Sequence, residues 1–239
     1  MEFRKYLENN QMKKPIFAAT RFAFLVPAIL CVNFSLRADV VYANTNNDLT
    51  ARFNPGLIEV GDEIVLAGGA RTVTDFNFEY WGLNFSGNEF ARIRFYANDG
   101  AASPAGPLLP NSLLFDSGFF FILPTPRAVL DFNSAALTSG NVLNLTGPVP
   151  NSFTWSVQFS GITAGESAGL DLYNPPTIGG NYDDYWDNNG GWQYRFRGTN
   201  ATPISFGASV SAVPEPAILG LGLLGGLAVL LVRNRFQRR

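Results

Sequence analysis

The side chains best suited to bind a ligand gather in one stretch, residues 179–192, with the sequence GGNYDDYWDNNGGW. Its carboxylates and amides are hard oxygen donors, and calcium takes about six to eight of them. The candidate calcium ligands are Asp183, Asp184 and Asp187. The stretch lacks the alternating acidic order and the closing glutamate of an EF-hand loop. We therefore expect a solvated acidic loop that joins two strands, with a calcium site as the alternative.

The same stretch carries aromatic rings beside its polar groups. Aromatic faces stack on sugar rings, while neighbouring polar groups hydrogen-bond the sugar hydroxyls. The candidate glycan contacts are Tyr182, Tyr185 and Trp186. The alternative is that Tyr185 and Trp186 pack over the edge of a β-sandwich. Trp155 and Trp192 lie in alternating segments, so we expect both of them in the core.

Several catalytic classes are excluded by residue type. The chain has no histidine, and its one cysteine, Cys31, lies in the predicted leader. Ser-His and Cys-His nucleophiles and histidine-based zinc sites are thereby excluded. A glycosidase would need two carboxylates roughly 5–9.5 Å apart. The available acids are Glu79, Glu89, Glu166, Asp171 and Asp183. Their spacing selects no pair, so we predict that the protein is not an enzyme.

Alternation of apolar and polar residues dominates the middle of the chain, residues 39–212. The clearest examples are residues 153–159, 192–196 and 204–210. Period two places one face of a strand in a core and the other in water. Short strands separated by turn residues indicate two packed antiparallel sheets. We predict an all-β fold with one antiparallel β-sandwich, jelly-roll-like by preference and immunoglobulin-like as the alternative.

Further strands are expected between Gly, Pro and Asn turn signals. Their expected ranges are 40–43, 63–66, 91–97, 113–115, 119–123, 128–132, 142–145 and 169–173. Between Tyr80 and Trp81 the apolar phase of the sequence shifts by one residue. This shift predicts a β-bulge, because it would otherwise turn the apolar side chains toward solvent.

The charge of the chain is unevenly distributed. Residues 39–216 carry seven Arg, no Lys and 17 Asp or Glu, which gives this region a net charge of −10. The other ten basic residues lie near the two ends. An acidic middle fits an exported domain, and it argues against nucleic-acid binding, which needs a basic surface.

The N-terminal region, residues 1–38, has the features of an export leader. Lys13, Lys14 and Arg21 precede an apolar run over residues 22–32. That run is too short to span a membrane and typical of a secretory signal peptide. Cleavage is expected after Ala38 or after Ala43. Translation could start at Met1 or at Met12, so residues 1–11 can be an extension ahead of the leader.

The C-terminal region, residues 213–239, has three parts in order. Pro214, Glu215 and Pro216 come first, and residues 217–232 follow without a charge. A helix over those 16 residues would be about 24 Å long, somewhat short of a ~30 Å bilayer core. Basic residues then close the chain, and they are expected to stop transfer on the cytoplasmic side. They are Arg233, Arg235, Arg238 and Arg239.

This arrangement resembles the PEP-CTERM sorting signal of exported bacterial proteins. The resemblance implies processing by an exosortase, a membrane cysteine transpeptidase-like enzyme that recognises Pro214, Glu215 and Pro216. It also implies removal of the tail, followed by release or attachment of the domain at the cell surface, often beside exopolysaccharide. An ordinary transmembrane tail anchor is the alternative.

Together these observations predict an exported cell-surface or extracellular-matrix protein. Its β-sandwich lies between an N-terminal signal helix and a C-terminal transmembrane helix. A non-catalytic structural or adhesive role is preferred. The second hypothesis is a carbohydrate-binding module for exopolysaccharide, and the third is a polysaccharide hydrolase. The expected partners are the exosortase, the membrane and exopolysaccharide, with no cofactor unless calcium binds.

Overall fold

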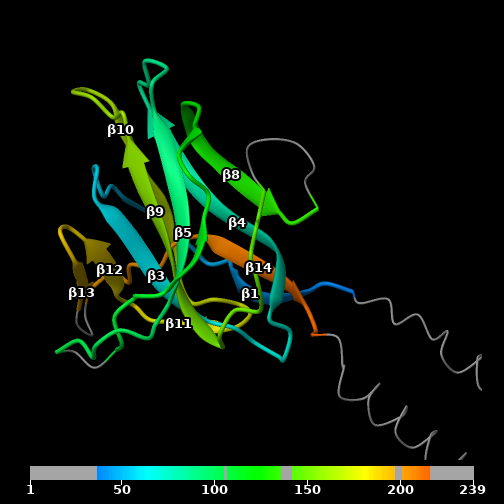
Figure 1. The fold of residues 1–239 in the computed structure, drawn as a ribbon. Helices are drawn as coiled ribbons and strands as arrows, with labels where there is room; N and C mark the ends of the chain where they lie inside the picture. The colour runs from blue at the N-terminus through cyan, green and yellow to red at the C-terminus, as the bar shows by residue number, and fades with distance from the viewer. Residues whose placement is uncertain (1–36, 105–106, 136–141, 197–200, 216–239) are drawn as a thin grey trace, which may run out of the picture. The chain divides into compact units, whose positions relative to one another are not determined.

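A computed structural model describes residues 37–104, 107–135, 142–196 and 201–215 (Figure 1). Residues 1–36 of the predicted leader, the apolar tail with its arginines, and Pro216 lie outside the described residues. The described part consists of strands and connecting segments and contains no helix. Every pair of named strands is antiparallel. The prediction of an all-β fold with two antiparallel sheets is therefore confirmed for this part of the chain.

The strands form two sheets. The first sheet has the order β1 (Asp39–Asn44), β14 (Ala208–Val213), β4 (Thr72–Leu83), β10 (Ser167–Tyr173) and β2 (Asp48–Phe53), and β8 (Thr125–Asn133) also pairs with β4. The second sheet has the order β13 (Trp192–Arg195), β12 (Tyr185–Asn188), β3 (Glu59–Val65), β9 (Ser152–Ser160), β5 (Phe90–Ala97) and β6 (Leu113–Asp116). In this sheet β11 (Gly180–Asn181) also pairs with β3, and β7 (Phe120–Phe121) pairs with β5.

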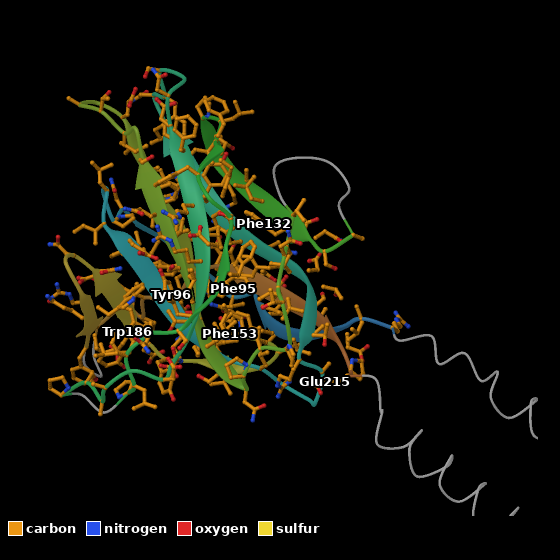
Figure 2. All side chains as sticks on the ribbon, in the orientation of Figure 1. Phe95, Tyr96, Phe132, Phe153, Trp186 and Glu215 are labelled. Carbon is orange, nitrogen blue, oxygen red and sulfur yellow. The ribbon has the colours of Figure 1, made fainter. Side chains whose placement is uncertain are left out.

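Aromatic rings from both sheets meet in one core. The indole of Trp155, on β9, lies 5.3 Å from the ring of Phe76 and 5.9 Å from that of Phe78, both on β4. Phe95 and Phe153 face each other across neighbouring strands at 5.1 Å, and Figure 2 shows both inside the domain. All five side chains are buried. The alternation over residues 153–159 thus places its apolar face against the opposite sheet, as predicted.

The predicted bulge in β4 has a different consequence from the one expected. The register of β4 against β8 shifts between Tyr80 and Gly82, at the predicted position. Tyr80 packs in the core, but Trp81 does not join it. Instead, the guanidinium of Arg52 covers the Trp81 ring at 5.4 Å. The outward apolar residue is therefore shielded by a side chain of β2, which lies beyond β10 in the same sheet, rather than turned inward.

Three strand predictions differ from the structure. Of the alternating residues 204–210, only residues 208–210 belong to a strand, β14, while Phe206 makes an isolated bridge with Leu172. The expected strand at residues 142–145 makes only a single bridge, between Val142 and Asn133. Strand β2 was not expected, because its sequence DLTARF has a weak apolar phase. Its side chains alternate between exposed and half-buried, which is typical of the edge strand that it forms.

Candidate functional site

The acidic aromatic stretch is a β-hairpin at the edge of the second sheet rather than a loop. Strands β12 and β13 pair from Tyr185 with Arg195 to Asn188 with Trp192. The turn uses Gly190 and Gly191, whose φ values of 78° and 144° are open to glycine and strained for other residues. Strand β12 also pairs with β3, so the hairpin extends the sheet. The expectation of a loop that joins two strands holds for residues 182–184, between β11 and β12, and it is corrected for residues 185–188, which form β12.

The three candidate glycan contacts have different environments. Tyr182 is exposed. The ring of Tyr185 packs on Phe53 of the first sheet with centroids 4.9 Å apart, which is the edge packing given as its alternative. Trp186 is fully buried, and its ring lies 4.9 Å from that of Tyr194 (Figure 2). In this arrangement Trp186 has no free face on which a sugar could stack.

Each of the three candidate calcium ligands interacts with a different side chain. Asp183 accepts a hydrogen bond from Asn174 Nδ2 at 3.1 Å, and Asp187 pairs with Arg195. Asp184 accepts a hydrogen bond from the Tyr194 hydroxyl at 2.8 Å. Burial and this carboxylate together raise the pKa of Tyr194. Within the described ranges, no group of three or more His, Cys, Asp or Glu residues is arranged to hold a metal ion.

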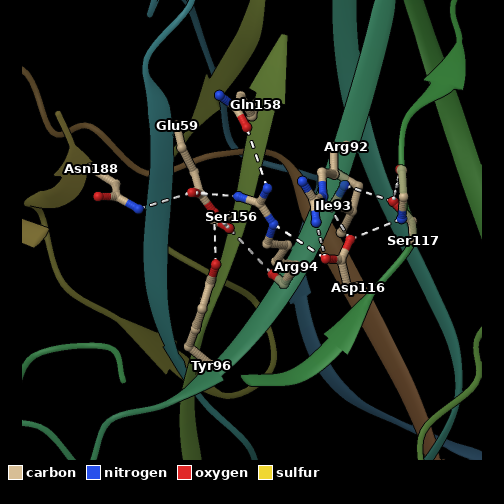
Figure 3. Close-up of polar contacts among 11 residues, drawn as sticks. Glu59, Arg92, Ile93, Arg94, Tyr96, Asp116, Ser117, Ser156, Gln158 and Asn188 are labelled. Carbon is tan, nitrogen blue, oxygen red and sulfur yellow. Dashed lines mark hydrogen bonds and ion pairs between the residues drawn. The ribbon is translucent and has the colours of Figure 1, made fainter. Parts of the chain in front are cut away.

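A polar network centred on Glu59 covers the outer face of the second sheet (Figure 3). On β5, Ile93 and Phe95 enter the core, so Arg92 and Arg94 take the opposite face. Glu59 of β3 is only 4% exposed, and its Oε2 forms an ion pair with Arg94 Nη1 at 2.6 Å. The remaining groups donate to its carboxylate; they are Ser156 Oγ at 2.6 Å, Asn188 Nδ2 at 3.0 Å and the Tyr96 hydroxyl at 3.2 Å.

The network continues to the neighbouring strand β6. Asp116 binds Arg92 through two hydrogen bonds and lies 3.5 Å from Arg94 Nε. These contacts hold the pKa of Asp116 below its ordinary value, chiefly through its hydrogen bond with Arg92. Arg92 and Arg94 thus form ion pairs with the carboxylates of Glu59 and Asp116. The arrangement can hold five strands in register, but it leaves neither carboxylate unpaired for acid or base chemistry.

The outer face of the first sheet brings together two of the five acids considered for a glycosidase. Arg127 Nε contacts Glu79 Oε1 at 2.5 Å, and Arg127 Nη2 lies 3.5 Å from Asp171 Oδ1. The Tyr173 hydroxyl donates to Glu79 Oε2 at 2.8 Å. Burial raises the pKa of Glu79. Sequence spacing could not select this pair, because its members lie on the separate strands β4 and β10, and Arg127 engages both.

A third polar group lies in the interior, where sequence analysis assigned only apolar packing. Asp62 is fully buried, and its Oδ2 accepts a hydrogen bond from the backbone N–H of Phe206 at 3.1 Å. Burial raises the pKa of Asp62 well above its ordinary value, which favours the neutral carboxyl. Nearby, Asn44 Nδ2 donates to Ser205 Oγ at 2.7 Å and to the Tyr173 carbonyl at 3.0 Å. This group ties β1 to the rest of the domain.

Part of the predicted sorting motif lies at the end of the last strand. Pro214 and Glu215 follow β14 directly, and both are exposed (Figure 2). They line a surface hollow of about 610 Å³ together with Asp39 and the turn at Gly68 and Gly69. An enzyme that reads this motif would therefore meet it on the surface of the domain.

A comparison of the chain with protein-family models, curated proteins and solved structures finds no match. In the part of the chain that the structure describes, between residues 37 and 215, no helix is long and apolar enough to cross a lipid bilayer.

Proposed function

We propose that this chain is an exported bacterial protein of the cell surface or extracellular matrix. The exported domain is a non-catalytic, jelly-roll-like β-sandwich with a structural or adhesive role. A signal helix in residues 1–38 exports it. The segment of residues 213–239 holds it in the membrane as a transmembrane helix and presents the PEP-CTERM motif to an exosortase.

One observation carries this proposal: the sheet begins directly after the predicted leader and ends directly before the Pro-Glu-Pro motif. Strand β1 begins at Asp39, immediately after Ala38, and β14 ends at Val213, immediately before Pro214. The two strands are neighbours, with Asp39 opposite Ala212 (Figure 1). Removal of both ends would therefore leave every described strand in place, which is what a processed cargo domain requires.

The same limits favour one of the two cleavage sites. Cleavage after Ala43 would remove Val41 and Tyr42, which are 3% and 0% exposed and belong to the core. It would also leave β14 without its neighbour β1. Cleavage after Ala38 keeps all of β1. We therefore propose Asp39 as the mature N-terminus.

The polar clusters on the sheet faces favour a structural role over a catalytic one. The carboxylates of Glu59, Asp116 and Glu79 are each engaged by an arginine. Such networks fix strand register and hold side chains in place. Carbohydrate binding is the second candidate function, and a cavity beside β13, described below, favours it.

Replacement of the sorting motif tests the proposal. In a bacterial host that carries an exosortase, we expect Pro214→Ala combined with Glu215→Ala to abolish removal of the tail. The variant would keep the mass of residues 217–239 and stay in the membrane fraction. Asp131→Ala, at an exposed acid on β8, is the matched control and should be processed like the wild type. Equal processing of the motif variant would overturn the proposal, as would a wild type that retains its tail.

A further inference from the structure

A hairpin arm extends from the second sheet beyond strands β5 and β6. We give this name to residues 98–112, of which residues 105–106 lie outside the described part. The backbone of the arm continues the strand pairing. The N–H of Ala97 donates to the carbonyl of Ser112 at 2.8 Å, and the N–H of Gly100 donates to the carbonyl of Leu109 at 3.0 Å. Leu109 N–H donates in turn to Ala101 at 2.9 Å. The Pro/Gly-rich segment is thus a hydrogen-bonded element with a defined position.

A cavity of about 330 Å³ lies between the hairpin arm and β13. Its volume falls at the lower end of the range for small-ligand sites, about 300–1,000 Å³. Four lining residues come from the arm and three from β13. They are Ala102, Ser103, Pro104, Leu109, Trp192, Gln193 and Tyr194.

The two aromatic residues of the cavity are held in place from behind. The ring of Trp192 meets that of Tyr96 edge to face at 5.3 Å. Tyr194 packs on the buried Trp186, and its hydroxyl donates to Asp184 at 2.8 Å. Both rings are half-buried, so part of each surface stays open to solvent. The expectation that Trp192 lies in the core is therefore corrected, because it lies on the outer face of the second sheet.

One polar side chain of this cavity has no hydrogen-bond partner among the residues that the structure describes. Ser103 is only 8% exposed, and among the described residues its Oγ has no hydrogen-bond partner. A buried hydroxyl without a partner costs about 1–3 kcal/mol. The backbone N–H of Ser103, by contrast, donates to Pro107 at 2.8 Å, so the residue itself is firmly placed. A ligand hydroxyl in the cavity would supply the missing partner.

We propose that this cavity binds a neutral sugar unit of a polysaccharide. Trp192 and Tyr194 lie on the same face of β13 and offer apolar faces to a sugar ring, and the Ser103 hydroxyl offers a polar group to the sugar hydroxyls. None of the lining residues is charged, so the site provides no counter-charge for an anionic ligand. The proposal rests on the proposed function, in that it names what the matrix protein holds. It moves the glycan contact from Tyr182, Tyr185 and Trp186 to the neighbouring strand.

Titration of the purified full chain in detergent with neutral oligosaccharides tests this proposal. The probes are cellohexaose, xylohexaose and mannohexaose, with a polygalacturonate oligomer as the anionic comparison. We expect calorimetry to show binding of at least one neutral probe and weaker or no binding of the anionic one. Trp192→Ala should weaken binding about tenfold or more, because it removes one wall of the cavity. Tyr182→Ala is the matched control and should leave the affinity unchanged.

Ser103→Ala separates ligand binding from a structural role. Because the hydroxyl has no partner in the described part of the protein, its removal should leave the melting temperature unchanged or raise it. The same variant should weaken sugar binding several-fold. No binding of any neutral probe would overturn the proposal, and so would unchanged affinity in both Trp192→Ala and Ser103→Ala. Because sorting plays no part in this titration, failure here would leave the processing experiment unaffected.

Discussion

Trp155→Ala is expected to lower the free energy of unfolding by about 3–5 kcal/mol. The indole, on β9 of the second sheet, is fully buried and contacts the rings of Phe76 and Phe78 on β4 of the first sheet. Besides Phe76 and Phe78, it meets Phe206 edge to face at 5.9 Å. Its removal would leave a cavity where the two sheets meet, and neighbours fixed on strands can collapse only partly into that space.

Urea denaturation followed by circular dichroism measures this effect on the purified full chain. Val129→Ala is the control, because that side chain is 62% exposed on β8. We expect this control to stay within about 0.5 kcal/mol of the wild type. A loss in Trp155→Ala below about 1 kcal/mol would contradict the packing of the two sheets through this residue.

Glu59→Ala is expected to cost about 3 kcal/mol of unfolding free energy. It leaves the Arg94 side chain, which is only 13% exposed, without its 2.6 Å partner. An uncompensated buried charge typically costs about 3–5 kcal/mol, and Asp116 at 3.5 Å offsets part of that cost. Ser156 and Tyr96 also lose the acceptor of their hydroxyl protons.

Two further variants show whether the charge causes this loss. Glu59→Gln keeps an acceptor for Ser156 and should lose less stability than Glu59→Ala. Adding Arg94→Met to Glu59→Ala removes the stranded charge, so the double variant should recover part of the loss. If the effects of Glu59→Ala and Arg94→Met simply add, the two residues do not interact, and the network is not the register-fixing element described above.

The fold class was predictable because strand periodicity is a local signal. Residues 153–159 carry both the alternation and the large apolar side chains that a two-sheet core needs. Trp192 was misplaced for a related reason. Alternation shows that one face of a strand is covered, but not whether a sheet or a hairpin arm covers it. In the structure, Trp192 faces Tyr96 and the arm rather than the sheet opposite.

The polar clusters could not be predicted, because their members are distant in sequence. Glu59 binds Asn188 across 129 residues, and Tyr173 binds Glu79 across 94. The sequence analysis missed the hairpin of β12 and β13 for a different reason. Its Asn and Gly turn and its acidic residues are typical of a loop, while Asp187 obtains its partner only when Arg195 returns on the next strand.

The intact mass of the wild-type protein isolated from its native host tests the central claim most directly. That claim is that the two ends direct the chain, and that the β-sandwich between them is delivered. We predict a mature chain that begins at Asp39 and has lost the apolar segment and the terminal arginines beyond Pro216. A mature product that begins inside β1, or that still carries Arg239, would contradict this account.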